Sequence, residues 1–326
     1  MNLLALFPHA LWHRKVSPTR RHAVRAVSRQ PGVRLHLTGS GWPDWDLTAT
    51  VEANARRIMP DADAIWWYKP LGSREAPPLV KPHECGLPAV ETLNECWWPD
   101  DRAVREIIAA GSTLVVCHHA NDVSRFAKTG QLVEVVHIPH AAEVAVFAAG
   151  AKPWDDRTID VLLTGSLNRE HYPLRCRLAD LMRRGKLPGR CHLHPRPPLR
   201  AASLAECECH VREYAGMVGR SKIALGCSSR WRYPLAHYPE KAMAGARVVA
   251  DMPELAPPGY DRMVEPIDPA WTDQQIVARI GELLADDEAL RLAAQIGQAV
   301  ALRFYTMDCY AARFLEAVRA QIFVRP

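Results

Sequence analysis

A glycine turn in the second half of the chain has the residue types that suit a phosphate group. The apolar run Ile159–Thr164 leads into Gly165 and Ser166, and Arg169 and Arg175 follow at the start of a predicted helix over 173–184. A glycine turn lets the backbone approach a phosphate, and the start of the next helix adds its dipole. The segment therefore predicts a phosphate-binding turn, although small residues also follow many strands that bind nothing.

A second segment whose residue types suit ligand binding spans residues 221–254. Its aromatic loop, which includes Tyr233, leads into a predicted helix over Leu235–Ala244 that carries Glu240. An acid about one turn into such a helix can accept hydrogen bonds from both hydroxyls of a ribose, while backbone amides hold a diphosphate. A solvated helix glutamate is the alternative, but the surrounding Tyr, Pro and Ala residues are not typical of a solvated face. The pattern favours a nucleotide-binding role for Glu240.

Candidates for proton transfer lie in the first half of the chain. His118 and His119 follow the predicted strand Thr113–Cys117, and Asp122 comes closely behind. His or Asp suits the work of a general base near neutral pH. We therefore expect His119 and Asp122 to be catalytic. The competing residues are Glu95, His9 and His13.

Aromatic and basic residues in the first half of the chain could bind a second substrate, which we call the acceptor. Trp97 and Trp98 form a pair that could stack on a sugar or a base, unless one of them belongs to the core. With His9 and His13 they are the candidate acceptor-binding residues. Residues 1–43 contain seven Arg or Lys and no acid. This local charge points to a phosphate-bearing acceptor, either an anionic glycolipid or DNA with a hydroxylated base. A small metabolite or a protein acceptor stays equally open.

The elements that must position these residues alternate between strands and helices in both halves. Short apolar or β-branched runs alternate with amphipathic segments, which indicates two parallel sheets covered by helices on both faces. A Gly- and Pro-containing stretch over Ala148–Asp156 separates the halves. We predict a Rossmann-like domain over 1–150, a second over 151–302 and a C-terminal helix over 303–326 that returns toward the first domain. In open parallel sheets, ligands bind beyond the carboxyl ends of the strands.

Composition excludes several other classes of protein. The 326 residues are 48% hydrophobic and 24% charged, which is ordinary for a globular protein and not for a disordered or fibrous one. No apolar run approaches the roughly 18 residues that would span a bilayer. The nine cysteines are odd in number and scattered, so reduced thiols and a cytoplasmic location are expected. Asp61-Ala62-Asp63 precedes an apolar run and does not follow one, so we expect no metal.

The segment 221–254 resembles the donor-binding region of GT-B glycosyltransferases, in particular the CgeB-like and phage-type enzymes. LLTGSLNREHYPLR, HIPHAAEVAVF and YTMDCYAARFLEAV are similar to further stretches of that family. The resemblance implies a nucleotide-sugar donor, most simply a UDP-sugar, that is held in a cleft between two Rossmann-like domains with no other cofactor. A monomer or a dimer fits equally. The donor-binding residues that it implies are Gly165, Ser166, Arg169, Lys222, Arg232, Tyr233, Leu235, Ala236 and Glu240.

One departure from the family pattern bears on function. Related retaining enzymes carry two glutamates eight positions apart, and here the first position is Arg232 while the second is Glu240. An arginine can pair with phosphate, but it cannot accept hydrogen bonds from sugar hydroxyls. The sequence therefore favours a glycosyltransferase, with two alternatives. One is a non-catalytic nucleotide-binding scaffold, and the other is a nucleotide-sugar epimerase.

Overall fold

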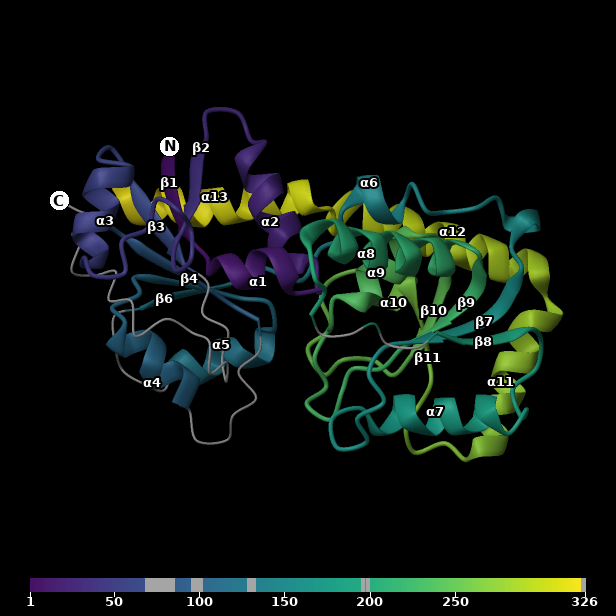
Figure 1. Ribbon diagram of the computed structural model, residues 1–326. Helices are drawn as coiled ribbons and strands as arrows, with labels where there is room; N and C mark the ends of the chain where they lie inside the picture. The colour runs from purple at the N-terminus through teal and green to yellow at the C-terminus, as the bar shows by residue number, and fades with distance from the viewer. Residues whose placement is uncertain (68–85, 95–101, 128–132, 195–196, 198–199, 324–326) are drawn as a thin grey trace.

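The chain folds into two parallel β-sheets, one in each half, with helices on both faces of each (Figure 1). The computed structural model describes residues 1–67, 86–94, 102–127, 133–194, 197 and 200–323. The strand order is β2-β1-β3-β4-β5-β6 in the first sheet and β11-β10-β9-β7-β8 in the second. All the pairings between these strands are parallel. The predicted fold class, two Rossmann-like parallel-sheet domains, is confirmed.

The first sheet is buried on both faces, as its continuous apolar strands predict. Leu3 and Ala5 of β1 pack toward α2 and α13, whereas Leu4 and Leu6 pack toward α3. Successive side chains of a strand point to opposite faces, so an unbroken apolar run requires cover on both. The strands of this half are β1 (Asn2–Leu6), β2 (Arg34–Thr38), β3 (Ala64–Trp67), β4 (Ala89–Leu93), β5 (Leu114–Cys117) and β6 (Glu134–His137). Its helices are α1 (His9–Arg14), α2 (Thr19–Ser28), α3 (Val51–Ile58), α4 (Arg102–Ala109), α5 (Ala120–Ala127) and α6 (Val144–Phe147).

The second sheet shows the same division into two faces. Val161 and Leu163 of β7 pack with α7 and α11, while Leu162 packs with the side that holds α9 and α10. Figure 1 shows α7 and α11 on one face of this sheet and α8, α9 and α12 on the other. The strands are β7 (Ile159–Thr164), β8 (Cys191–His194), β9 (Ser221–Leu225), β10 (Arg247–Ala250) and β11 (Val264–Pro266). The helices are α7 (Pro173–Arg183), α8 (Leu204–Gly219), α9 (His237–Met243), α10 (Tyr260–Met263), α11 (Asp273–Ala285), α12 (Asp287–Phe304) and α13 (Met307–Phe323).

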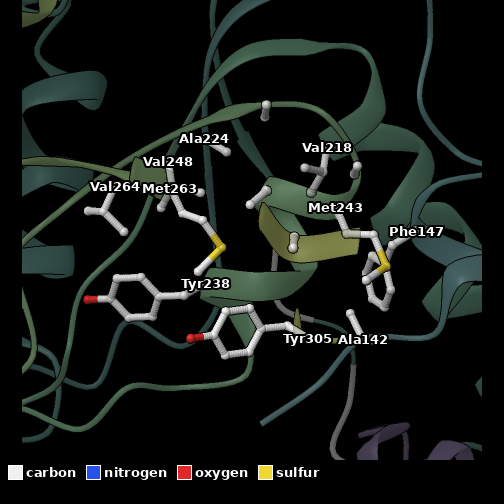
Figure 2. Packing of buried hydrophobic residues seen from close by; sticks show 14 of the residues in the cluster. Ala142, Phe147, Val218, Ala224, Tyr238, Met243, Val248, Met263, Val264 and Tyr305 are labelled. Carbon is white, nitrogen blue, oxygen red and sulfur yellow. The ribbon is translucent and has the colours of Figure 1, made fainter. Parts of the chain in front are cut away.

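Two segments connect the halves. The chain first crosses through α6, where Ala142 and Phe147 pack with Tyr238 of α9 and Tyr305 (Figure 2). It then returns through α13, whose Phe314 and neighbours belong to the core of the first sheet. A backbone bridge between Ala142 and Thr306 ties the two crossings together. The last helix is therefore part of the first domain's core, although it ends the sequence. Among the described residues no helix is long and apolar enough to cross a membrane.

Candidate functional site

The site is built where the carboxyl ends of adjacent strands meet in the second domain. β9 lies between β7 and β10, so the residues that follow these three strands converge at one edge of the sheet. Gly165 follows β7, Gly226 follows β9, and Asp251 follows β10. This edge is the place at which open parallel sheets bind ligands. The predicted glycine turn and the Glu240 segment are therefore neighbours, as the alternating pattern required.

A buried arginine lies directly against the glycine turn. Gly165 has φ of +104°, and a Cβ at this position would lie 2.8 Å from Nη1 of Arg175. Arg175 is 5% exposed, donates from Nη1 to the Ser166 carbonyl at 3.3 Å and lies over the Tyr172 ring at 4.3 Å. Its Nε is buried without a hydrogen-bond partner. A guanidinium that is held by a carbonyl and an aromatic ring keeps its positive charge available for an anion at this turn.

Two of the predicted donor-binding cations lie elsewhere. Arg169 is exposed and pairs with Asp180 at 2.9 Å on the outer surface of α7. Lys222 is the second residue of β9, at the amino end of the strand, and its Nζ lies 2.5 Å from Asp287 Oδ1. Gly165 and Gly226 lie at the opposite edge of the sheet, where the carboxyl ends of the strands meet. Of the two arginines that follow the turn in the sequence, the structure therefore places Arg175 against Gly165, while Lys222 lies at the other end of its strand.

Glu240 is a buried carboxyl, not a solvated one. Its residue is 8% exposed, and burial raises its pKa to about 7 against the opposing effects of Lys241 and a hydrogen bond from Tyr214. The Tyr214 hydroxyl also bonds to Thr164 at the end of β7. Lys241 is completely buried, and its Nζ donates to the Leu225 carbonyl at 2.5 Å. Burial, aided by the charge of Arg175, lowers the pKa of Lys241 to about 7.

The loop between β9 and α9 is fixed by its own hydrogen bonds. Ser228 donates from its backbone N to Asp251 Oδ1 at 2.8 Å and from its hydroxyl to the other carboxylate oxygen. His237, the first residue of α9, accepts at Nε2 from the Cys227 backbone N at 3.3 Å. A Cβ on Gly226 would lie 2.8 Å from that nitrogen, so only glycine leaves room for the ring. Leu235 and Ala236 come just before α9, with Ala236 at its N-cap.

The same loop reaches the first domain through Tyr233. Its hydroxyl donates to Asp122 Oδ1 at 2.6 Å, and its ring stacks on His119 with centroids 4.2 Å apart and planes 1° apart. His119 is fully buried and Asp122 is 1% exposed. The predicted catalytic pair therefore lies at the domain interface, but Tyr233 covers it. A second contact joins Asn121 Nδ2 to Glu254 Oε2 at 3.4 Å.

A group of buried histidines surrounds this contact. His118 stacks on His140 at 4.3 Å, and His140 lies edge-on to His119 at 5.1 Å. Burial lowers the pKa of His118 to about 4 and the pKa of His119, His140 and His237 well below the usual value. Each additional positive charge here would repel its neighbours. These imidazoles are neutral at physiological pH, and the burial that keeps them neutral also makes His119 a weak base in this closed arrangement.

The candidate acceptor residues are only partly within the described structure. His9 and His13 lie one turn apart on α1, with ring centroids 3.9 Å apart, and His9 packs edge-on against Trp42 at 5.1 Å. The structure thus brings His9 and His13 together at the carboxyl ends of β1 and β2. Glu95, Trp97 and Trp98 lie outside the described residues.

Three arginines of the first 43 residues pair with acids from outside that stretch, which the sequence alone did not reveal. Arg25 pairs with Glu208 at 2.6 Å and Arg29 with Glu143 at 3.0 Å, both acids of the second half or the crossing segment. Arg34 pairs with Asp61, and Arg21 is buried against main-chain carbonyls. Three of the seven cations of this acid-free stretch are therefore balanced by acids from outside it.

The sequence offers both Arg169 and Arg175 after the turn, and only the fold shows that Arg175 lies against it. One contact of the site was missed at the level of sequence. Tyr214 reaches Glu240 from α8, 26 positions earlier in the chain, and no sequence signal links the two. Among the described residues, no group of three or more His, Cys, Asp or Glu side chains is placed to hold a metal ion.

Comparisons with known proteins agree with this architecture. No family model matches the sequence, and no curated protein matches it. Among solved structures, the chain is similar over its whole length to sucrose-phosphate synthase from Thermosynechococcus elongatus, with TM-score 0.62, 10% identity and 100% of both chains covered. It is also similar to Anabaena Alr3699/HepE, solved in complex with UDP and glucose, with TM-score 0.62, 12% identity and coverage of 98% and 100%. UDP-GlcNAc 2-epimerase from Neisseria meningitidis, bound to UDP-GlcNAc, aligns with TM-score 0.54, 12% identity and coverage of 98% and 100%. The fold is therefore that of the GT-B glycosyltransferases.

Proposed function

We propose that the protein is a glycosyltransferase that moves a sugar from a nucleotide-diphosphate donor to a hydroxyl acceptor. The observation that carries this proposal is the buried Arg175 against the Gly165 turn, together with the buried Glu240 of α9, at the carboxyl ends of β7 and β9. The Arg175 guanidinium attracts a diphosphate, and the Glu240 carboxyl can bond to ribose hydroxyls. The position of the group fits the ligand edge of a parallel sheet. UDP is the first nucleotide to test, because HepE was solved with UDP and with UDP-glucose.

Each residue near the interface has a proposed role in the transfer. Arg175 and the amides around Gly165 and Ser166 stabilise the negative charge that develops on the departing diphosphate. His119 takes the proton of the acceptor hydroxyl once Tyr233 has moved off its face, because access of water to the ring then relieves the burial that lowers its pKa. Asp122 acts as a positioning residue through its bond to Tyr233. The acceptor approaches from the first domain, where His9 and His13 lie beside Trp42; its identity stays open among the glycolipid, DNA, metabolite and protein classes.

An epimerase is the second candidate, because one similar structure is a UDP-GlcNAc 2-epimerase. Such an enzyme would convert the donor sugar without any acceptor. Incubation of the protein with UDP-sugars alone, followed by chromatography of the sugar products, separates the two reactions. A new epimer without acceptor would replace the transferase proposal. Nucleotide binding without any turnover would favour a non-catalytic scaffold.

The first experiment is a thermal-shift panel with UDP, GDP, ADP, CDP and dTDP. A ligand that binds only the folded state stabilises it by about 2.7 kcal/mol at a hundredfold excess over Kd, which shifts the melting curve measurably. We expect one base to give a selective shift, and Glu240→Ala to abolish it. Glu282→Ala, at an exposed position of α11, is the matched control and keeps the shift. Absence of a shift with every nucleotide would overturn the proposal.

A further inference from the structure

The hydroxyl of Tyr214 connects the two parts of the proposed nucleotide site. It forms hydrogen bonds with Glu240 of α9 and with Thr164, the last residue of β7. Thr164 directly precedes the Gly165 turn, against which Arg175 lies. The turn proposed for the diphosphate and the carboxyl proposed for the ribose are therefore joined by one phenol, which comes from α8.

The sequence of α8 directs this side chain toward α9. Tyr214 recurs at helical spacing with three buried residues of α8, namely Cys207, Val211 and Val218. The helix packs against both α6 and α9. The Tyr214 ring lies edge-on to Phe147 of α6, with ring centroids 5.8 Å apart. This packing holds the ring in place, so its hydroxyl meets Glu240 in a defined position.

The direction of the two hydrogen bonds follows from the single proton of the phenol. An ionised Glu240 can only accept, so the Tyr214 hydroxyl donates to this carboxylate, and the Thr164 hydroxyl donates to the Tyr214 oxygen. The bond from Tyr214 lowers the pKa of Glu240, whereas burial raises it, with a net value of about 7. Tyr214 therefore favours the ionised form of a carboxyl that burial shifts toward the protonated form.

The ionised form of Glu240 is the one that suits a ribose. A carboxylate has acceptor sites only and can accept hydrogen bonds from two adjacent hydroxyls, whereas a protonated carboxyl carries a proton on one of these oxygens. Arg232, which stands where the related enzymes have their other glutamate, is exposed and donates to the Met252 carbonyl at 3.0 Å, so it supplies no acceptor. Ribose binding at this site thus depends on the orientation and charge of Glu240.

We propose that Tyr214 is a positioning residue of the nucleotide site, which holds Glu240 as a carboxylate that faces the ribose hydroxyls. The inference rests on the proposed function, because it takes Glu240 as the residue that binds the ribose. It extends the site to α8, with Thr164 as the residue that orients the Tyr214 hydroxyl.

Other charged and titratable groups lie around this chain of hydrogen bonds. Lys241 lies beside Glu240. Arg175 interacts with Tyr214, and His237 interacts with both cations. Titration of these groups, or of the diphosphate itself, acts on a ribonucleotide and on its 2′-deoxy counterpart alike. The ratio of the two affinities therefore isolates the contact between Glu240 and the ribose.

Isothermal titration calorimetry on the full-length protein measures this ratio between pH 6 and pH 9, with UDP, GDP, ADP and CDP each compared with its 2′-deoxy counterpart. In the wild type we expect the ribonucleotide to bind about 10-fold more tightly above pH 7, and this preference to decrease at lower pH as Glu240 takes up a proton. Tyr214→Phe should move this decrease upward by about 1–2 pH units, because a hydrogen bond to the charged form is lost. The preference should then be small at pH 7.5 and reappear toward pH 9.

Two further variants test whether the effect belongs to this chain of hydrogen bonds. Tyr238→Phe removes another buried phenol bond of α9, the 2.7 Å bond to the Asp251 carbonyl, and should keep the wild-type pH profile. Thr164→Val removes only the outer bond and should give a smaller shift in the same direction as Tyr214→Phe.

A pH profile that Tyr214→Phe leaves unchanged would overturn the inference, as would a preference that this variant loses at every pH up to 9. In either case the wild type still binds the nucleotide, so the proposed function stands. Binding without any ribose preference in the wild type would remove the ribose role of Glu240 and this inference with it. If none of the four nucleoside diphosphates binds, the proposed function itself fails.

Discussion

The Tyr233 hydroxyl of the second domain donates a hydrogen bond of 2.6 Å to the Asp122 carboxylate of the first. Together with the stacking of Tyr233 on His119, this bond closes the interface directly over the candidate base. Domains that share a limited interface are expected to move relative to each other. The bond therefore stabilises the closed arrangement, and its loss should favour an open one.

Tyr233→Phe should release this contact while leaving the stacking surface in place. A hydrogen bond to a charged group contributes about 1.5–3 kcal/mol, so we expect a loss of that order in the free energy of unfolding. Small-angle scattering should show a larger radius of gyration. Tyr305→Phe is the control, because that hydroxyl bonds to the Pro258 carbonyl within the second domain. An unchanged radius of gyration in Tyr233→Phe would contradict the role of this bond in closure.

Arg175→Gln and Arg169→Gln form a matched pair of substitutions that separates the buried cation from the exposed one. Arg175 has an unpartnered Nε under the Gly165 turn, whereas Arg169 pairs with Asp180. We expect Arg175→Gln to weaken binding of the nucleoside diphosphate about 10–100-fold, because a charge-assisted hydrogen bond is lost. Arg169→Gln should change it less than about 2-fold, since an exposed ion pair contributes little. Isothermal titration calorimetry measures both, and the reverse ranking would restore Arg169 to the site.

Gly226→Ala should disturb the loop through His237. A Cβ at Gly226 would lie 2.8 Å from His237 Nε2 and 3.3 Å from the Ala250 Cβ, and neither neighbour is at the end of a flexible chain. Overpacking of a buried position costs about 1–3 kcal/mol, so the melting temperature should fall. Gly185→Ala is a useful comparison. Gly185 has φ of +61° but nothing within 4 Å of an added Cβ, so its cost is backbone strain alone. If Gly226→Ala melts at the wild-type temperature, the close packing of His237 is not rigid.

Much of this fold could be predicted because the strands are short, apolar and bounded by turns. The run Ile159–Thr164 forms a strand with the predicted bounds, and the predicted helix over 173–184 differs from α7 by one residue. β4 was not predicted, because Glu91 stands in the centre of Ala89–Leu93 and breaks the apolar run, yet it is fully buried. A hydrophobic pattern in the sequence indicates which residues are buried only when those residues are apolar.

The site was harder to predict than the fold, for a physical reason. The local sequence predicted that Glu240 lies near the start of a helix. The residues that shift its pKa are Tyr214 of α8 and the adjacent Lys241, and the local sequence does not predict the contact with Tyr214. Arg169 lies in the loop before α7 and Arg175 in the helix itself, so which of them contacts the glycine turn depends on the path of that loop. The pairing of Asp122 with Tyr233 joins residues 111 positions apart. Such contacts arise from packing between the domains, so no periodic pattern in the sequence predicts them.

The buried histidines predict that the protein is destabilised by acid. His118, with a folded pKa of about 4, and His119, His140 and His237, whose pKa values are also lowered, stay neutral in the folded state. Unfolded histidines bind protons near pH 6.5, so the unfolded state gains protons first as the pH falls. Stability should therefore decrease from about pH 7 toward pH 4, by at most about 1.4 kcal/mol per pH unit for each histidine. Glu240 acts in the opposite sense between its unfolded value and about 7, because its folded pKa is raised.

Urea unfolding at a series of pH values measures this slope. His140→Leu should reduce the slope by up to about 1.4 kcal/mol per pH unit, whatever its effect on absolute stability, because one buried neutral imidazole is removed. Glu240→Gln should make the slope steeper by removing the opposing carboxyl. A wild-type stability that is flat or rises as the pH falls through this range would show that the histidines are not buried as neutral groups.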